Sequence, residues 1–475
     1  MRLPALYNTE RFEKMSVSAE HELQHRSGTI RFRSLVEDHF FYDENGTPEA
    51  VINTVSYLGD AEPGVPERPV LFLWNGGPGS ATSMLQLECF GPYQMKKDEK
   101  DHPINELEED PGCLLDRCDL VFVDPVGVGF SRLLREEAAE RYYSLMGDAR
   151  SNAFAVLDWI RTHRRWNSPV YLLGESYGTI RVCRLLEEFG RNPMEGNRMM
   201  LGLPIAGVIL VGVALSMDAK GGTFDSAIDL LTAALPSMAA THWYHNIRGN
   251  GADGSDPVTE AEFTEQARQF AARELRPAQF LGEDCPDSEI ERIAGELSRL
   301  TGMSASYYIR NRLRLSSVED FMLQVVQARG ERVDLYDARM TFPLEGAYNL
   351  VGNGNIPLQL MNGCLAERLG LGTDRQYYTG NINVNVGWNY EGLDHPTNLE
   401  CLRSAMNRMP DMKVLVASGR YDLCTLLGNT RYIFSHAGLG KTRLKMREYS
   451  GGHGVYSSAE GKREFLEDIR TMIGE

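Results

Sequence analysis

The sequence predicts an α/β fold in which a mostly parallel central sheet is flanked by helices. The first observation is a series of short, almost wholly apolar runs, each followed closely by glycine or proline. Strands of this kind are buried on both faces, as in a parallel sheet covered by helices. The second observation is a helix-like stretch at 148–164, whose apolar residues fall on one face and which lies between two of the runs. The runs are residues 70–74, 120–123, 170–173, 208–211 and 414–416.

Length and charge narrow the class of protein. A chain of 475 residues that is 42% hydrophobic can bury a large core, and we expect one large domain with an insertion. The net charge of −17 argues against nucleic acid or an anionic membrane as a partner. No apolar run approaches the ~20 residues of a membrane span. Residues 1–26 are charged throughout and have no apolar signal segment, so they predict a polar leader and a cytoplasmic protein.

The eight cysteines are scattered along a large chain that needs no disulfides to fold, so we expect reduced thiols. Cys113 and Cys118 lie near each other but far from other cysteine or histidine residues, and they do not make a zinc-binding set. The sequence therefore predicts neither a metal nor a cofactor. It does not predict an oligomeric state.

Strand-like runs at 29–33, 40–42 and 50–58 precede the first buried run, and Asn45-Gly46 between them is typical of a hairpin. We expect these runs to form an antiparallel entry to the sheet. The first part of the core is predicted at 27–224.

Residues 225–340 change in character, because helical repeats of mixed charge such as 260–275 and 288–300 replace the apolar runs. An insertion of this size after a core strand predicts a helical cap, with the second part of the core at 341–475. The aromatic stretch 235–245 either lines a pocket or belongs to the core of the cap. The sequence leaves these two alternatives open.

The five residues Gly174-Glu175-Ser176-Tyr177-Gly178 stand between the apolar run 170–173 and a helix-like stretch. A serine hydroxyl is a poor nucleophile until it is exposed beside a base, and a sharp strand-to-helix turn between glycines supplies that exposure. This pattern predicts an α/β-hydrolase fold with Ser176 as the nucleophile.

A nucleophilic serine needs a base and an acid that orients the base, and in α/β-hydrolases these follow in the order Ser, Asp or Glu, His. Asp422 follows the apolar run 414–416, and His453 stands in a glycine-rich loop near the end of the chain. Asp411 competes for the role of acid, but it precedes that run and would lie at the wrong end of the sheet. We therefore predict Asp422 as the orienting acid and His453 as the base.

The tetrahedral intermediate of acyl transfer needs two main-chain donors. One is expected to be the amide of Tyr177, directly after the nucleophile. The other is expected from the glycine-rich turn Trp74-Asn75-Gly76-Gly77-Pro78-Gly79-Ser80. This turn lacks the Lys-Ser/Thr ending of a phosphate-binding loop and the spacing of a dinucleotide fingerprint, so we do not expect nucleotide binding.

These motifs, together with Asp124-Pro125-Val126-Gly127-Val128-Gly129-Phe130-Ser131, resemble the serine carboxypeptidases, in the same order and from about residue 30 onward. The resemblance is closest to the branch of bacterial members without a signal peptide. It implies hydrolysis of the C-terminal peptide bond of peptides that have a free terminal carboxylate, through an acyl-enzyme on Ser176. It also implies that Gly77 and Tyr177 form the oxyanion hole and that Asn75 and Glu175 bind the substrate's carboxylate.

The chain departs from the family pattern at one carboxylate-binding position. Eukaryotic members carry a further glutamate two residues before a Gly-Pro pair, where this chain has Cys89; its glutamate is Glu88, one residue out of step. Glu88 stays a candidate for substrate binding. The alternative function is that of an esterase or acyltransferase of the same fold acting on small acyl substrates, and a binding protein without turnover is the alternative of a different class.

Overall fold

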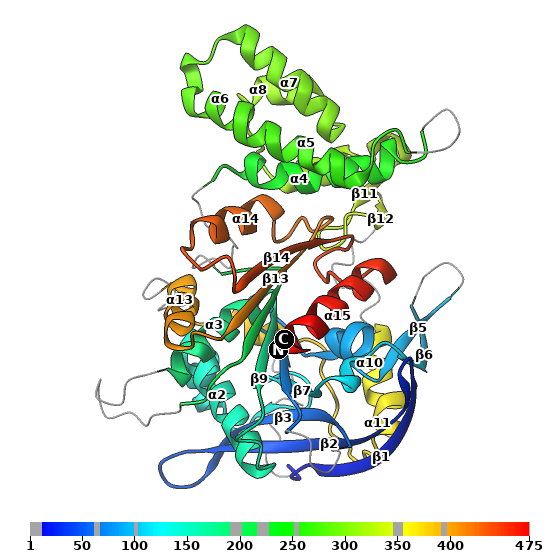
Figure 1. Cartoon of the computed structure of the whole chain (residues 1–475), viewed down its shortest axis with the longest axis vertical. Coiled ribbons are helices and arrows are strands. Elements are labelled where there is room, and N and C mark those ends of the chain that lie inside the picture. The colour runs from blue at the N-terminus through cyan, green and yellow to red at the C-terminus, as the bar shows by residue number, and fades with distance from the viewer. Residues whose placement is uncertain are drawn as a thin grey trace.

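The structure is a computed structural model of the whole chain. It describes residues 12–60, 67–98, 103–190, 202–215, 228–250, 256–344, 355–390 and 397–474. Figure 1 shows a central sheet with helices on both sides and a helical layer beyond one edge of the sheet.

A ten-stranded sheet with the order β1-β2-β3-β7-β4-β9-β10-β13-β14 forms the centre of the molecule, and the short β8 pairs with β3. In this spatial order, the neighbours from β1 through β2 and β3 to β7 are antiparallel, and the neighbours from β7 through β4 and onward to β14 are parallel. The predicted fold, a mostly parallel sheet with an antiparallel entry, is therefore confirmed. The strands are β1 (Ser16–His25), β2 (Gly28–Tyr42), β3 (Pro48–Gly59), β4 (Val70–Trp74), β7 (Asp119–Asp124), β8 (Arg132–Leu133), β9 (Val170–Glu175), β10 (Gly207–Val211), β13 (Lys413–Gly419) and β14 (Leu444–Tyr449).

The register of the parallel strands places their carboxyl ends along one edge. Val211 at the end of β10 lies opposite both Glu175 of β9 and Ala417 of β13. Gly419 at the end of β13 lies opposite Tyr449 of β14. Because the loops that follow these strands leave from the same edge, the segments carrying Ser176, Asp422 and His453 meet there.

Helices cover both faces of the sheet, and each face has its own cluster of buried apolar side chains. One face carries α2 (Leu145–Thr162), α3 (Tyr177–Phe189) and α13 (Asn398–Arg408), and the other carries η2 (Leu85–Phe90), α10 (Asn355–Leu360) and α15 (Ala459–Gly474) (Figure 1). The apolar residues expected on the inner face of the 148–164 helix, Ala149, Ala153, Val156 and Ile160, are all buried in α2.

The insertion between β10 and β13 supplies the helical layer drawn at the top of Figure 1. It has a hydrophobic core of its own, to which the loop after β13 adds Tyr421, Leu423 and Leu426. Leu235, Met238 and Trp243 lie in this core, so the aromatic stretch 235–245 packs the cap. The elements are α4 (Leu230–His242), α5 (Glu260–Phe270), α6 (Arg276–Leu281), α7 (Asp287–Thr301), α8 (Ala305–Arg310), α9 (Val318–Gln324), β11 (Glu331–Val333) and β12 (Thr341–Pro343).

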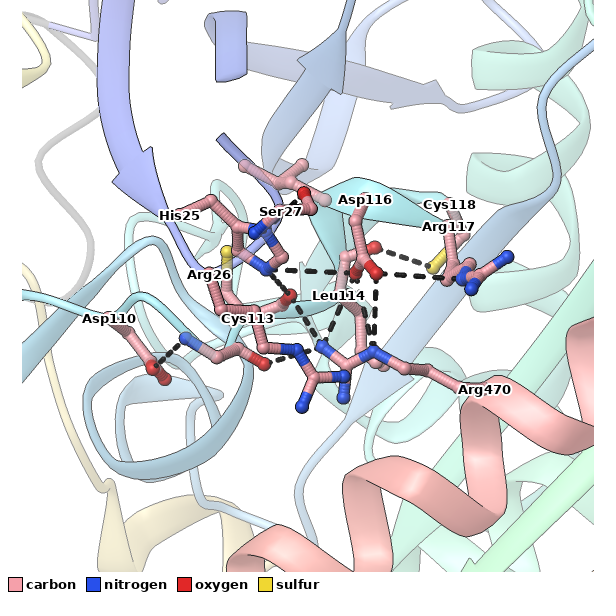
Figure 2. A network of polar contacts seen from close by, with 12 residues as sticks. His25, Arg26, Ser27, Asp110, Cys113, Leu114, Asp116, Arg117, Cys118 and Arg470 are labelled. Carbon is pink, nitrogen blue, oxygen red and sulfur yellow. Dashed lines mark hydrogen bonds and ion pairs between the residues drawn. The ribbon is translucent and has the colours of Figure 1, made fainter. Parts of the chain in front are cut away.

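Residues 16–25, which the sequence assigned to a polar leader, form strand β1 and pair with β2 along their whole length. The prediction was wrong for these residues because main-chain hydrogen bonds to β2 hold the segment, and composition does not reveal such bonds. His25, the last residue of β1, is buried. Its Nδ1 lies 2.7 Å from Ser27 Oγ, and its Nε2 lies 3.1 Å from the carbonyl oxygen of Cys113. Arg470 of α15 donates to the same carbonyl at 2.9 Å, so strand β1 and helix α15 are both bonded to one loop (Figure 2).

Two further elements lay outside the sequence prediction. A hairpin of β5 (Tyr93–Lys97) and β6 (Pro103–Glu109) follows η2, and β14 forms the edge of the sheet. Within the described residues, none of the helices combines the length and the apolar character that a bilayer crossing requires.

Candidate active site

Ser176 lies at the turn between β9 and α3 with φ 58° and ψ −126°, a backbone conformation that residues other than glycine rarely adopt. Its side chain is partly exposed, whereas both neighbours are buried. Glycine is required before the turn, because a β-carbon at Gly174 would lie 2.0 Å from the carbonyl oxygen of Gly178. The sequence pattern thus folds into a sharp turn that presents one hydroxyl.

Asp422 and His453 meet at the same edge of the sheet. His453 Nδ1 lies 2.8 Å from Asp422 Oδ2, and the carboxylate of Asp422 is fully buried. The main-chain amides of Cys424 and Thr425 donate to Asp422 Oδ1 at 2.7 and 2.9 Å, and the Thr425 hydroxyl donates to Oδ2. These donors fix the direction of the carboxylate toward the imidazole.

Thr425 was missed by the sequence analysis. Its hydroxyl also lies 3.3 Å from His453 Nδ1, so it contacts both members of the pair. The available signal was an aspartate followed three residues later by threonine at the end of a strand, a spacing at which such side chains often close a local turn.

The environment of His453 favours a charged imidazolium. Burial by itself lowers the pKa of His453, but the charge and hydrogen bond of Asp422, with a contribution from Glu175, raise it above the ordinary value. When the imidazole is neutral, as a base must be, and Nδ1 donates to Asp422, the other nitrogen, Nε2, is the acceptor. Nε2 is buried, and it has no hydrogen-bond partner among the residues described.

Ser176 and His453 flank the end of β10. The main-chain amide of Ser176 donates to the carbonyl oxygen of Val211 at 2.9 Å, and a β-carbon at the next residue, Gly212, would lie 2.9 Å from the imidazole of His453. The hydroxyl of Ser176 is not hydrogen-bonded to Nε2. Such bonds are often long in the free enzyme and shorten when substrate binds.

The glycine-rich turn 74–80 lies directly against the turn of Ser176. A β-carbon at Gly76 would be 2.6 Å from the amide nitrogen of Tyr177 and 2.7 Å from Cβ of Ser176. The next residue, Gly77, has φ 107°, which suits glycine alone. In the described part of the chain, the amides of Gly77 and Tyr177 donate no hydrogen bond, so two neighbouring donors remain available to an oxyanion.

A buried ion pair fastens the glycine-rich turn to the helices. Arg181, one turn into α3, donates from Nη1 to the carbonyl oxygen of Asn75 at 2.6 Å and from Nη2 to that of Pro78 at 3.4 Å. Its Nε donates to Asp148 of α2 at 2.8 Å, and both charged side chains are buried. Local sequence patterns do not indicate this pair, because a charged residue near a helix end is usually solvated.

Two carboxyl groups lie close to the elbow. Glu175 is buried and accepts a 2.7 Å hydrogen bond from the hydroxyl of Tyr456. Burial raises the pKa of Glu175 above its ordinary value. The pKa of Glu88 is raised to about 7, by burial first and also by the negative charge of Glu175, against the opposing charge of Lys97.

Glu88 reaches this place although it is one residue out of step in the sequence. It lies in η2, a π-helix in which the amide of Gly91 donates to the carbonyl of Gln86, five residues back, at 3.0 Å. The third candidate, Asn75, accepts a 2.7 Å bond from the Gly76 amide at Oδ1, and its NH₂ group is left as a donor.

The end of the insertion is hydrogen-bonded to both of the loops that carry Asp422 and His453. The carbonyl of Leu335 accepts from the amide of Leu423 at 3.1 Å, and the carbonyl of Tyr336 accepts from the amide of His453 at 2.6 Å. The ring of Tyr336, which is 41% exposed, lies 5.4 Å from the imidazole between centroids. We call residues 335–339 the clamp segment.

Arg339 fixes the clamp segment to the histidine loop. It donates to Asp337 at 2.9 and 2.6 Å, to Ser457 Oγ at 2.9 Å and to the carbonyl of Ser450 at 3.3 Å. The amide of Gly452, next to His453, donates to the same Ser457 Oγ at 2.9 Å. The clamp segment and the base thus share one polar network.

Comparisons with known proteins bear on the fold. Residues 57–210 match the model of the serine carboxypeptidase family. A solved structure, Kex1(delta)p, a prohormone-processing carboxypeptidase from Saccharomyces cerevisiae, aligns at a TM-score of 0.55 and 12% identity, over 92% of this chain and 91% of that chain. The esterase E22 L374D mutant aligns at a TM-score of 0.38 and 14% identity, over 97% of this chain and 100% of that chain. No curated protein matches the sequence. The α/β-hydrolase fold predicted from the elbow is confirmed.

Proposed function

We propose that the chain is a serine-type carboxypeptidase that removes the C-terminal residue of peptides, a proposal supported by the match of residues 57–210 to the serine carboxypeptidase family. The observation that carries this proposal is the pair of carboxyl groups, Glu175 and Glu88, beside the nucleophile. The pKa of each is raised, so each favours the neutral form that can donate a hydrogen bond.

Such a pair suits a substrate with a free terminal carboxylate. An ionised carboxylate beside two ionised glutamates is strongly disfavoured, but two neutral acids can each donate a hydrogen bond to it. The NH₂ group of Asn75 supplies a third donor. A substrate that continues beyond this point would bury these groups without an anion to bind, which favours cleavage at the last peptide bond.

The proposed reaction runs through an acyl-enzyme. The hydroxyl oxygen of Ser176 attacks the carbonyl carbon of the last peptide bond while His453 Nε2 takes the hydroxyl proton. The amides of Gly77 and Tyr177 stabilise the oxyanion, and Asp422 keeps the imidazole in the required tautomer and stabilises its charge. The imidazolium then protonates the leaving amino group, and a water molecule activated by His453 hydrolyses the ester on Ser176.

The test compares peptides with free and amidated C-termini. The protein is incubated with a mixed peptide library, and mass spectrometry is expected to find one-residue losses from the C-terminus of the free acids and much slower loss from the amides. Ser176→Ala is the control and is expected to abolish the loss while the melting temperature stays close to that of the wild type.

A fluorophosphonate probe separates the remaining outcomes. Labelling that disappears in Ser176→Ala is expected of the proposed enzyme. Labelling together with hydrolysis of small esters, but without loss of residues from any peptide, would contradict the carboxypeptidase and favour an esterase or acyltransferase. A folded protein that is not labelled would exclude an active serine hydrolase.

A further inference from the structure

Tyr456 has no role in the function proposed so far. It lies three residues after His453, at the turn that leads into α15, and its side chain is buried. Its hydroxyl oxygen lies 2.7 Å from Glu175 Oε2. In the part of the chain that the structure describes, neither the hydroxyl of Tyr456 nor the carboxyl group of Glu175 makes another hydrogen bond.

The direction of this bond follows from its surroundings. Burial, and then the negative charges of Glu175 and Glu88, raise the pKa of Tyr456 well above its ordinary value, so the phenol keeps its proton. That proton has one acceptor within reach, Glu175 Oε2. Because Oε2 already accepts a hydrogen bond, the acid proton of a neutral Glu175 is favoured on the other oxygen, Oε1.

We propose that Tyr456 is a positioning residue, which fixes the proton of neutral Glu175 on Oε1 and so directs its hydrogen bond to the terminal carboxylate of the substrate. This inference rests on the proposed carboxypeptidase function and specifies how its carboxylate site works. It also couples the site to the base, because Tyr456 and His453 stand on one loop.

The charged groups around Glu175 define the expected pH dependence. They are Asp422 after β13, His453 and Tyr456 after β14, and Glu88 on η2. The charge of His453 and the bond from Tyr456 lower the pKa of Glu175, whereas burial and Asp422 raise it. Removal of the phenolic hydroxyl therefore raises the pKa of Glu175 further, but leaves the acid proton free to occupy either oxygen.

The experiment measures kcat and KM of Tyr456→Phe against pH, for a peptide acid and for the ester or amide of the same peptide. For the acid, KM is expected to rise about fivefold at mildly acidic pH, which corresponds to the loss of one ordinary hydrogen bond. The pH at which KM begins its alkaline rise is expected to move upward. For the ester or amide, which has no terminal carboxylate, KM is expected to change little, and kcat is expected to change far less than KM.

Tyr449→Phe is the matched control. Tyr449 is also buried, and its hydroxyl donates a 2.7 Å hydrogen bond to a carboxylate, that of Asp468. The substitution removes the same chemical group a few residues away without touching Glu175. It is expected to leave the pH profile of KM in its wild-type position.

A second variant separates the effect on the acid proton from any other effect of Tyr456→Phe. In Glu175→Gln, the amide NH₂ group takes the place of the acid proton, and Tyr456 can still donate to the amide oxygen. Adding Tyr456→Phe to this variant is expected to raise KM without any shift along the pH axis. A wild-type pH profile in Tyr456→Phe, or the same shift in Tyr449→Phe, would overturn the proposal. A wild type that releases no residue from any peptide would refute the carboxypeptidase itself, which is a separate result.

Discussion

The main-chain amide of His453 donates a 2.6 Å hydrogen bond to the carbonyl of Tyr336, a residue of the insertion. The position of the proposed base therefore depends on a segment that precedes it by more than a hundred residues in the sequence. Both loops that carry the Asp422 and His453 pair are bonded to this clamp segment, so a change in the segment should alter catalysis without contact with substrate.

Arg339→Ala is expected to lower kcat by roughly 10- to 100-fold, because a small displacement of a reacting group has an effect of that size. The substitution removes the bonds from Arg339 to Asp337, Ser457 and the Ser450 carbonyl that hold the histidine loop. Stopped assays of peptide hydrolysis and of fluorophosphonate labelling would both show the decrease.

The control for this prediction is Arg299→Ala, which breaks an exposed ion pair with Glu296 on the cap helix α7. Such a pair contributes little to stability, so wild-type kcat and melting temperature are expected. If Arg339→Ala keeps full kcat, the clamp segment does not position the base.

Asp422→Asn is expected to lower kcat by up to about 10⁴-fold, because an amide favours the wrong imidazole tautomer. Thr425→Val, which deletes one donor to the same carboxylate, should cause a much smaller loss, since the amides of Cys424 and Thr425 remain. Single-turnover acylation rates measure both effects. Equal activities of Asp422→Asn and wild type would exclude Asp422 as the orienting acid.

The two glutamates and His453 together predict that activity on peptide acids decreases on both sides of a pH optimum. The pKa values of Glu175 and Glu88 are both raised, so both acids lose their protons as the pH rises and KM for peptide acids should increase. As the pH falls, the base His453, whose pKa is also raised, becomes protonated and kcat should decrease. A maximum of kcat/KM at mildly acidic pH is therefore expected.

Glu175→Gln tests the alkaline limb, because an amide donates a hydrogen bond at any pH. The variant should lose most of the pH dependence of KM and keep much of its kcat. Parallel KM profiles for acid and amide substrates in the wild type, unchanged in Glu175→Gln, would make Glu175 a structural acid and remove the main support for the carboxypeptidase.

The cysteines give a prediction about the compartment in which the protein works. The structure joins none of the eight by a disulfide, and burial raises the pKa of Cys113 and of Cys401 to about 12. Alkylation of the native protein should therefore be slow at these positions. Under denaturing, non-reducing conditions most of the eight thiols should react, whereas three or four disulfides would place the protein in an oxidising compartment.

The parts of the fold that could be predicted from the sequence are those that short local patterns of residues determine. Apolar runs identified the parallel strands, and the glycines around Ser176 identified the elbow, because a tight turn leaves no room for a β-carbon. Strand β1 was missed because its polar residues are held by pairing with β2, a partner that local composition does not reveal.

The site contains two features that depend on distant contacts. Glu88 interacts electrostatically with Glu175, which lies on another element, and local sequence does not disclose that interaction. The partners of Tyr456 and Arg339, which are Glu175 and Ser457, lie on other segments of the chain and come close only in the folded structure. Their residue types alone carry no signal of this.

The hydrogen bond from Arg181 to the carbonyl oxygen of Asn75 links two parts of the site. The helix that begins at Tyr177 holds, one turn later, the loop that supplies the second oxyanion donor, and Asp148 ties both to α2. The proposed nucleophile and oxyanion donors are thus linked by one set of buried polar contacts. The clamp segment is bonded to the loops of Asp422 and His453, so a displacement of this segment would change the alignment of Ser176 with His453 rather than the shape of the proposed oxyanion hole.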